Sequence, residues 1–155
     1  MTNNGIETQH GALYKSLLLL LAFNGITAVL GGIALITNII SPDIELLRNT
    51  LFSSFVIPGI LLTVIVGGSA LAALLLFIKK HDFAALVALL SGFIMDTWIL
   101  AEMLLIVEFS WFQILYLITG IGVVILSAEF LLSNLEQQNT ARPKTNNTTG
   151  DQGAS

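Results

Sequence analysis

The residues SLLLLLAFNGITAVLGGIALITNIISP, from Ser16 to Pro42, contain no charged side chain. Uncharged stretches of similar length follow at Asn49–Ile78 and Phe109–Ala128, and a fourth, Phe83–Val107, is interrupted only by two acidic residues. About 20 apolar residues in a helix cross the roughly 30 Å hydrocarbon core of a bilayer. The sequence therefore predicts an all-α protein, a membrane-spanning four-helix bundle with short connections.

The composition of the chain agrees with this fold class. Of its 155 residues, 55% are hydrophobic and 10% are charged, whereas charged residues make up about a quarter of a soluble domain. Four spans leave no room for a second folded domain, and the polar segment from Glu136 has no apolar periodicity. The expected organisation is a short N-terminal tail (1–12), a bundle (13–135) with spans at about 13–40, 50–78, 83–107 and 110–133, and a disordered polar tail (136–155).

Residue counts exclude several classes of function. Six basic residues cannot form a nucleic-acid-binding surface. The chain has no cysteine, and both histidines, His10 and His81, lie outside the predicted spans, so neither a thiolate metal site nor a haem-binding bundle is expected. We therefore expect no catalytic residues, no metal and no cofactor. The expected partners are the lipid bilayer, further copies of the chain and other membrane proteins.

The few basic residues favour one orientation in the membrane. Five of the six fall on one side of the predicted spans, and only Arg48 falls on the other. Because Lys and Arg are enriched in cytoplasmic loops, the sequence predicts that both termini and the turn at residues 79–82 face the cytoplasm. The five residues are Lys15, Lys79, Lys80, Arg142 and Lys144.

Small residues recur at helical spacing in every span. In lipid such stripes let helices approach closely, and we expect them to form the helix contacts. The stripes are Thr27, Ala28, Gly31 and Gly32 in the first span; Gly59, Thr63, Gly67 and Ala70 in the second; Ala88, Gly92 and Asp96 in the third; and Gln113, Tyr116, Gly120 and Ser127 in the fourth. Pro58, followed by Gly59, is expected to kink the second span because proline has no N–H to donate.

Asp96 and Glu102 are the candidate functional residues, since an acid within the hydrocarbon is costly and usually faces the bundle interior. They are separated by about 9 Å along a helix and by about 120° around it, so they cannot form a paired-carboxylate site. By depth, Asp96 is expected to pair with Asn24 at the midplane. Glu102 is expected to form a polar layer with Tyr116 and Gln113. Three roles remain open for each acid: a structural hydrogen bond, a proton or cation relay, and binding of a ligand.

The chain contains three short motifs: FVIPGIL (Phe55–Leu61) at the start of the second span, WILAE (Trp98–Glu102) in the third, and SWFQ (Ser110–Gln113) at the turn into the fourth. They resemble motifs of a family of small, uncharacterised bacterial proteins that are integral to the membrane and have four spans. The resemblance covers about residues 13–132 and departs at Phe112, where leucine is usual. It implies a location in the bacterial inner membrane and favours Glu102 over Asp96 as a shared site, but it implies no reaction.

The sequence thus favours an integral membrane protein with a non-enzymatic, structural or accessory role. The alternative is a small proton- or cation-coupled carrier that works as a dimer, with Glu102 or Asp96 as the coupling carboxyl. An enzyme acting on lipid or quinone ranks last because no catalytic set is present. The neighbours and the solvent access of Glu102 should distinguish these interpretations.

Overall fold

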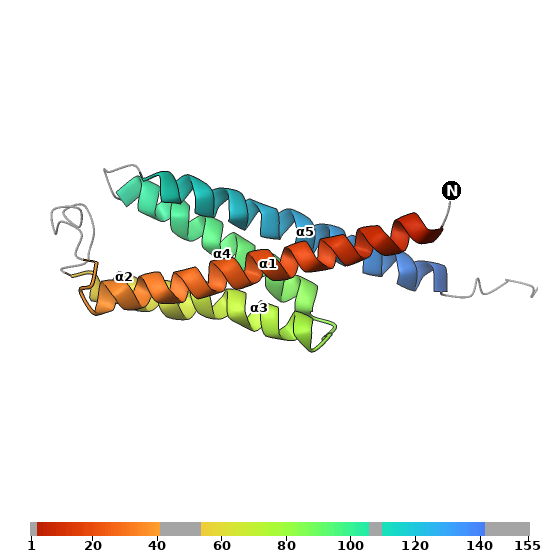
Figure 1. Cartoon of the computed structure of the whole chain (residues 1–155), viewed down its shortest axis with the longest axis horizontal. Helices are drawn as coiled ribbons and strands as arrows, with labels where there is room; N and C mark the ends of the chain where they lie inside the picture. Colours follow the sequence, from red (N-terminus) through yellow and green to blue (C-terminus); the bar gives the residue numbers. More distant parts are fainter. Residues whose placement is uncertain (1–2, 41–53, 106–109, 142–155) are drawn as a thin grey trace, which may run out of the picture.

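The computed structural model describes residues 3–40, 54–105 and 110–141. These residues form the helices α1 (Asn3–Ile36), α2 (Val56–Leu61), the π-helix η2 (Leu62–Gly67), α3 (Gly68–Ile78), α4 (Ala84–Leu105) and α5 (Trp111–Ala141) (Figure 1). Four segments are long and apolar enough to cross a membrane: Gly11–Ile36, Val56–Ile78, Ala84–Leu104 and Trp111–Glu136. The predicted all-α fold with four spans is confirmed, and the chain is a multi-pass membrane protein.

Two helices are longer than predicted. α1 begins at Asn3, within the segment expected to be an N-terminal tail, and α5 continues to Ala141, beyond the predicted start of the polar tail at Glu136. Extending an existing helix costs far less than nucleating one, so polar residues beside a span can continue its hydrogen-bond ladder. Residues 142–155, the remainder of the predicted disordered tail, lie outside the described residues, as does Arg48.

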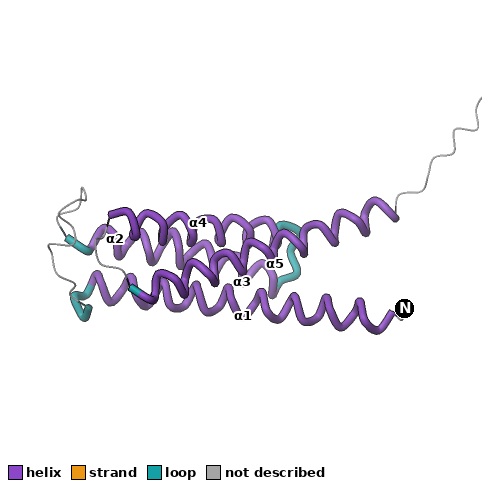
Figure 2. Tube along the Cα trace, turned by 90° about the horizontal axis from the view of Figure 1, so that it is seen from above, coloured by secondary structure: helices purple, strands orange, loops and turns teal. Residues whose placement is uncertain are grey.

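The helices form two antiparallel hairpins, α1 with α2–η2–α3, and α4 with α5. The start of α1, the turn between α3 and α4, and the end of α5 lie at one end of the bundle, which we call the turn end (Figures 1 and 2). In Figure 1 the hairpins lie close together near this turn and diverge toward the opposite end, where α1 and α4 end. Accordingly, α4 packs closely against α3 and only loosely against η2. A second buried cluster, made of Ala28, Val66, Met95 and Ile99, joins the hairpins farther from the turn.

A buried cluster closes the turn end. Phe77 is 2% exposed; its backbone carbonyl accepts a hydrogen bond from the Tyr14 hydroxyl (3.1 Å). Its ring meets those of Tyr14 and Phe130 edge to face, with centroids 6.0 and 5.4 Å apart, a favourable geometry for aromatic pairs. These contacts join α1, α3 and α5. The cluster consists of Leu17, Leu21, Ala73, Phe77, Ala84, Ala85, Ala88 and Val123.

Both α1 and α3 end in the same way. Asn38 and Lys80 have positive φ angles of 55° and 53°. The following residue in each case donates its N–H to a carbonyl five residues earlier, Ile39 to Ala34 (3.0 Å) and His81 to Leu76 (2.9 Å). This is the Schellman arrangement, which satisfies the last carbonyls of a helix. It ends each helix, and with it a candidate membrane span, without leaving those carbonyls unpaired.

Glycines set the distance between α1 and the segment α2–η2–α3 in the first hairpin. A Cβ added at Gly59 would lie 2.8 Å from the carbonyl oxygen of Gly32, and one added at Gly67 would lie 2.6 Å from Cγ2 of Val29. Real Cβ atoms do not approach other atoms so closely, so each glycine is required by the packing. Further contacts of this kind pair Gly32 with Thr63 and Gly25 with Leu71.

The predicted stripe on α1 is only partly confirmed. Gly32 lies in the contact as expected, whereas a Cβ at Gly31 would meet only Leu62, at 3.7 Å. Ala28 is 4% exposed and lies in a buried cluster with Val66, so it also faces the bundle as expected. The contact face of α1 runs through Gly25 and Gly32, which are seven residues apart and therefore on the same side of a helix.

In the second hairpin, glycines again mark the line of contact. A Cβ added at Gly92 would lie 2.7 Å from Cγ2 of Val124 and 3.1 Å from the carbonyl oxygen of Gly120. One added at Gly120 would collide with the carboxyl group of Asp96. The stripe predicted on the third span, from Ala88 through Gly92 to Asp96, therefore does face the interior of the bundle, since Ala88 is fully buried.

Pro58 begins a helix instead of bending one. The second span was predicted to start near residue 50, which would place Pro58 inside it, but α2 begins at Val56. In a first turn the backbone N–H groups have no acceptor within the helix, so the missing N–H of proline interrupts nothing. The N–H of Gly59 donates to the carbonyl of Phe55 at 2.9 Å. The predicted kink at Pro58 and Gly59 is therefore not formed, and Gly59 serves the contact with α1.

The irregular part of the second span is the π-helix η2. A π-helix shifts the backbone hydrogen bonds by one residue, which changes the donors available to carbonyls at its two ends. Hydroxyl groups add donors near both ends: Thr63 Oγ1 donates to the carbonyl of Gly59 (2.8 Å), which also accepts from the N–H of Leu62, and Ser69 Oγ donates to that of Val66 (3.0 Å). Such pairing matters in lipid, where no water is available to the backbone.

The glycine contacts predict the effect of larger side chains. Gly67→Leu and Gly92→Leu should each destabilise the protein by about 1–3 kcal/mol or more, because the added atoms must force packed helices apart. Leu75→Ala is the control, since Leu75 is 55% exposed and its loss leaves no cavity between helices. Thermal unfolding in detergent measures all three. Equal unfolding temperatures for the three variants would contradict the assigned contact faces.

Candidate functional site

Both intramembrane acids lie on α4 and face different neighbours. Glu102 is three residues from the end of this helix, and Asp96 is six residues earlier, near its middle. Neither acid has a basic neighbour along the chain, because residues 83–141 contain no Lys, Arg or His. Each carboxyl group must therefore be stabilised by neutral groups or by something outside the chain.

Glu102 is bound by a tryptophan of its own helix. The indole Nε1–H of Trp98 donates to Oε1 of Glu102 at 2.6 Å. Residues four apart are neighbours on a helix surface, which places the ring beside the carboxyl group. The distance is short for an N–H···O bond. Trp98 therefore supplies the neutral donor that an acid in lipid needs.

The predicted layer of Glu102, Tyr116 and Gln113 is not assembled. Gln113 is buried, but its Oε1 accepts from the backbone N–H of Ser110 (3.1 Å), while the Ser110 hydroxyl accepts from the N–H of Phe112 (3.4 Å). This is a capping box, which satisfies free N–H groups at the start of α5. The ring of Tyr116 stacks on Phe23 of α1 with centroids 6.0 Å apart. The side chain of Gln113 therefore binds the start of α5, and the ring of Tyr116 packs against α1, so neither joins Glu102.

The predicted pair of Asp96 and Asn24 is also not formed. Asn24 is 2% exposed, and its Oδ1 accepts from the hydroxyl of Thr119 at 2.9 Å. The same hydroxyl lies 3.0 Å from the carbonyl of Tyr116, so its single proton is shared between two acceptors. The physical reason is geometric: Asn24 reaches Thr119 of α5, whereas Asp96 lies against Gly120.

Asp96 faces the same turn of α5 from the other side. Its carboxyl group lies against the backbone of Gly120, the residue after Thr119. Oδ1 of Asp96 is buried and has no hydrogen-bond partner among the described residues. The two neighbouring residues of α5 thus receive polar side chains from two different helices, Asn24 from α1 and Asp96 from α4. This arrangement is a polar layer near the middle of the bundle.

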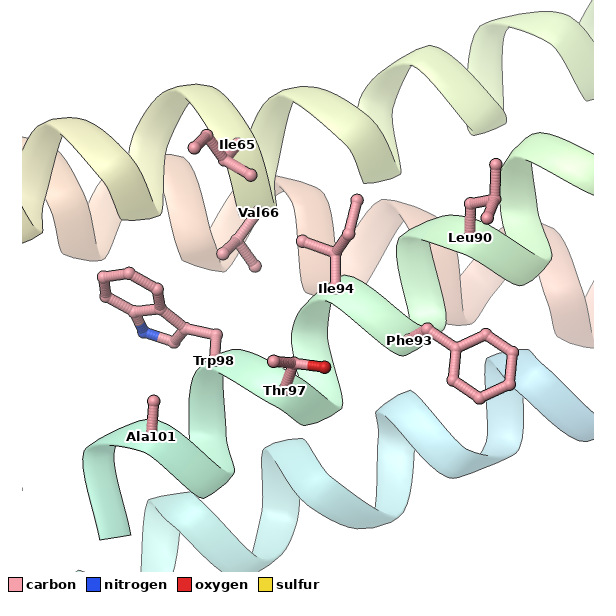
Figure 3. A pocket seen from close by; sticks show the side chains of 8 residues that line it. All are labelled: Ile65, Val66, Leu90, Phe93, Ile94, Thr97, Trp98 and Ala101. Atoms are coloured by element: carbon pink, nitrogen blue, oxygen red, sulfur yellow. The ribbon is translucent and has the colours of Figure 1, made fainter. Parts of the chain in front are cut away.

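A groove runs along one face of α4 beside η2, and we call it the α4 groove. Its volume is about 360 Å³. Ile65 and Val66 of η2 form one wall (Figure 3). The other wall consists of α4 residues at the spacing of a single helix face, namely Leu90, Phe93, Ile94, Thr97, Trp98 and Ala101. The groove is apolar except for the Thr97 hydroxyl and the Trp98 indole N–H, which is directed to Glu102.

Neither a metal-binding cluster nor a known relative identifies the function of this site. Among the described residues, no group of three or more His, Asp or Glu side chains lies close enough together to hold a metal ion. Comparison with protein-family models, with curated proteins and with solved structures finds no match to this chain. The candidate site is therefore defined by its own geometry: the Trp98–Glu102 pair at the end of the α4 groove, and the midplane layer around Thr119 and Gly120.

The bond between Trp98 and Glu102 can be tested with a double substitution. Trp98→Phe should destabilise the protein by about 1–3 kcal/mol, because the carboxyl group loses its donor. Adding Glu102→Leu should recover most of this loss, since removing both partners of a buried bond is nearly neutral. Thermal unfolding in detergent gives both values. Trp111→Phe is the control, because Trp111 is 65% exposed and lies at the start of α5. Additive effects of the two substitutions would exclude the interaction.

Proposed function

We propose that the protein is an integral protein of the bacterial inner membrane with a non-enzymatic, structural or accessory role. The observation that carries this proposal is the 2.6 Å hydrogen bond from Trp98 to Glu102. Glu102 is the acid of the WILAE motif, and its bond joins two positions of one helix. A carboxyl group held in this way stabilises a surface of α4, as a structural role requires.

Other polar groups in the spans support the same role. Asn24 and Thr119 join α1 to α5, the Tyr14 hydroxyl joins α1 to α3, and Gln113 caps the start of α5. Each of these groups is engaged in holding a helix or a helix pair. Buried polar groups of this kind fix the register of membrane helices without any reaction. Partners in such a role would be lipids, further copies of the chain or other membrane proteins.

The alternative, a small proton- or cation-coupled carrier, is favoured by one observation. Oδ1 of Asp96 is buried near the middle of α4 without a partner in the described part of the chain. Intramembrane acids in proton and ion pathways occupy such positions. Asp96 is therefore the coupling carboxyl in this alternative. The Asn24–Thr119 hydrogen bond lies beside it, because Thr119 precedes Gly120, the α5 residue that the Asp96 carboxyl contacts.

For the orientation we propose that the turn end is cytoplasmic. Lys79 and Lys80 lie in the α3–α4 turn, at the same end of the bundle as the start of α1 and the end of α5 (Figure 1). The positive-inside rule then assigns both termini to the cytoplasm.

Single cysteines test this orientation, because the chain has none of its own. Ile39→Cys and His81→Cys place a thiol at opposite ends of the bundle, at positions that are both exposed. We expect an impermeant thiol reagent on intact cells to label the first variant and not the second. Both should be labelled after the cells are opened, which controls for reactivity. Labelling of His81→Cys alone on intact cells would reverse the proposed orientation.

The two candidate functions differ in what the acids must do. Glu102→Gln keeps an acceptor for the Trp98 indole but removes the exchangeable proton, whereas Glu102→Ala removes both. A structural role predicts normal stability for the Gln variant and a loss of about 1–3 kcal/mol for the Ala variant. Glu129→Gln is the control, since Glu129 is exposed on α5.

Proton flux in reconstituted vesicles completes this test. For a structural protein, dissipation of a pH gradient should be no faster than in empty vesicles, with or without Glu102→Gln or Asp96→Asn. Proton flux that either substitution abolishes at unchanged stability would overturn the proposed role and establish the carrier.

A further inference from the structure

We propose that two copies of this chain associate side by side in the membrane through α4, with Thr97 of each copy hydrogen-bonded to Asp96 of the other. The proposal rests on the structural or accessory role and names a second copy of the chain as the partner. Two adjacent side chains carry it, because each has a polar group near the middle of a span and neither uses that group within the chain.

Thr97 offers an unused donor on the lipid-facing side of α4. Hydroxyl groups elsewhere in the helices donate to a carbonyl of the preceding turn, namely those of Thr27, Thr63, Ser69, Ser91, Thr119 and Ser133. The side chain of Thr97 is exposed, and its hydroxyl has no hydrogen-bond partner in the described part of the chain. In hydrocarbon no water is present to replace that partner.

The neighbouring residue, Asp96, offers the matching acceptor. It stands at the edge of the contact between α4 and α5: Gly92 and Ile99 beside it are buried, whereas Leu100 is 51% exposed. Residues three or four apart share a helix face, so the exposed part of Asp96 borders the lipid-facing side. Oδ1 is buried against Gly120, so Oδ2 is the oxygen that a partner can reach. A carboxyl group accepts hydrogen bonds whether it is ionised or protonated.

A twofold axis parallel to α4 brings the donor and the acceptor together. Thr97, Leu100 and Leu104 are spaced by three and four residues, as the contact positions of a coiled coil are, and Asp96 lies beside this stripe. In a parallel pair of helices, a residue in the stripe packs against the flanking residue of its partner. By symmetry each copy then donates one hydrogen bond and accepts one.

A second copy satisfies this surface, whereas lipid does not. Leu104 is 87% exposed, so the stripe is left uncovered by the chain itself. Lipid tails have no hydrogen-bonding groups and would leave both polar side chains unpaired. A symmetric contact pairs the donor with the acceptor and needs no basic residue, and residues 83–141 contain none. Polar side chains of this kind hold membrane helices together.

Single cysteines locate the contact, because the chain has none of its own. Leu104→Cys places a thiol in the stripe, and Leu30→Cys, the control, places one at a position of α1 that is 61% exposed. After reconstitution into phosphatidylcholine vesicles and oxidation with copper phenanthroline, we expect a disulfide-linked dimer from the first variant and a monomer from the second. Equal cross-linking of the two, or none in Leu104→Cys, would exclude α4 as the contact.

Energy transfer between chains labelled through His81→Cys measures their association in the same vesicles. Thr97→Val and Asp96→Leu keep the side-chain shapes but remove the donor and the acceptor, and each should weaken association about tenfold. The double variant should associate no more weakly than either single one, since both changes remove the same bonds. Asp96→Asn should associate as the wild type does, because its amide oxygen remains an acceptor. Unchanged association in Thr97→Val would contradict the proposed bonds.

Failure of the dimer and failure of the proposed function give different results. Thermal unfolding in detergent shows that the fold is kept, and Asp96→Leu should unfold no earlier than the wild type, since it removes a carboxyl group that has no partner. Proton flux that Asp96→Asn abolishes would overturn the structural role and leave the dimer standing. Energy transfer in the wild type that disappears on dilution with lipid would overturn the dimer and leave the role standing.

Discussion

Hydrogen bonding without water is the constraint on which this structure depends. A backbone or side-chain polar group in hydrocarbon costs free energy unless it finds a partner within the protein, and among the described side chains the buried atoms without one are Asp96 Oδ1 and Ser127 Oγ. The hydroxyls of Thr63 and Ser69 provide donors at the ends of the π-helix, and Ser110 with Gln113 caps the start of α5. Trp98 provides a donor for Glu102 by the same logic. The spans can therefore contain an irregular turn and an acid while remaining helical.

Close approach of helices is the second requirement, and glycine meets it within each hairpin. Gly59 and Gly67 hold the first hairpin together, and Gly92 and Gly120 hold the second. Between the hairpins one buried cluster lies at the turn end, around Phe77 and its aromatic neighbours, and a second joins Ala28 and Val66 to Met95 and Ile99. The contact of α4 with η2 is smaller than its contact with α3, and the α4 groove lies beside it.

The sequence predicted the spans better than the side-chain partners. Hydropathy and length determine where four helices cross a bilayer, and small residues at helical spacing indicated the contacts of Gly59, Gly67 and Gly92. Depth alone predicts that Asn24 pairs with Asp96 and Glu102 with Gln113, and both pairings are wrong. Depth does not account for rotation about the helix axes or for partners nearby in the chain, which bind Glu102 and Gln113 instead. Two of the observed bonds did have sequence signals: the spacing of Trp98 and Glu102 on one helix face, and the S-x-x-Q pattern of a capping box. Asn24 with Thr119 had none, since it depends on how two distant helices are packed.

The two hairpins are held together by two buried clusters, one around Phe77 at the turn end and one that joins Ala28 and Val66 to Met95 and Ile99. The α4 groove lies beside the second cluster, and its outer residues Leu90, Phe93 and Ile65 are exposed. In a bilayer, lipid chains therefore complete the packing of α4 on that side, so the solvent of this protein is also part of its packing.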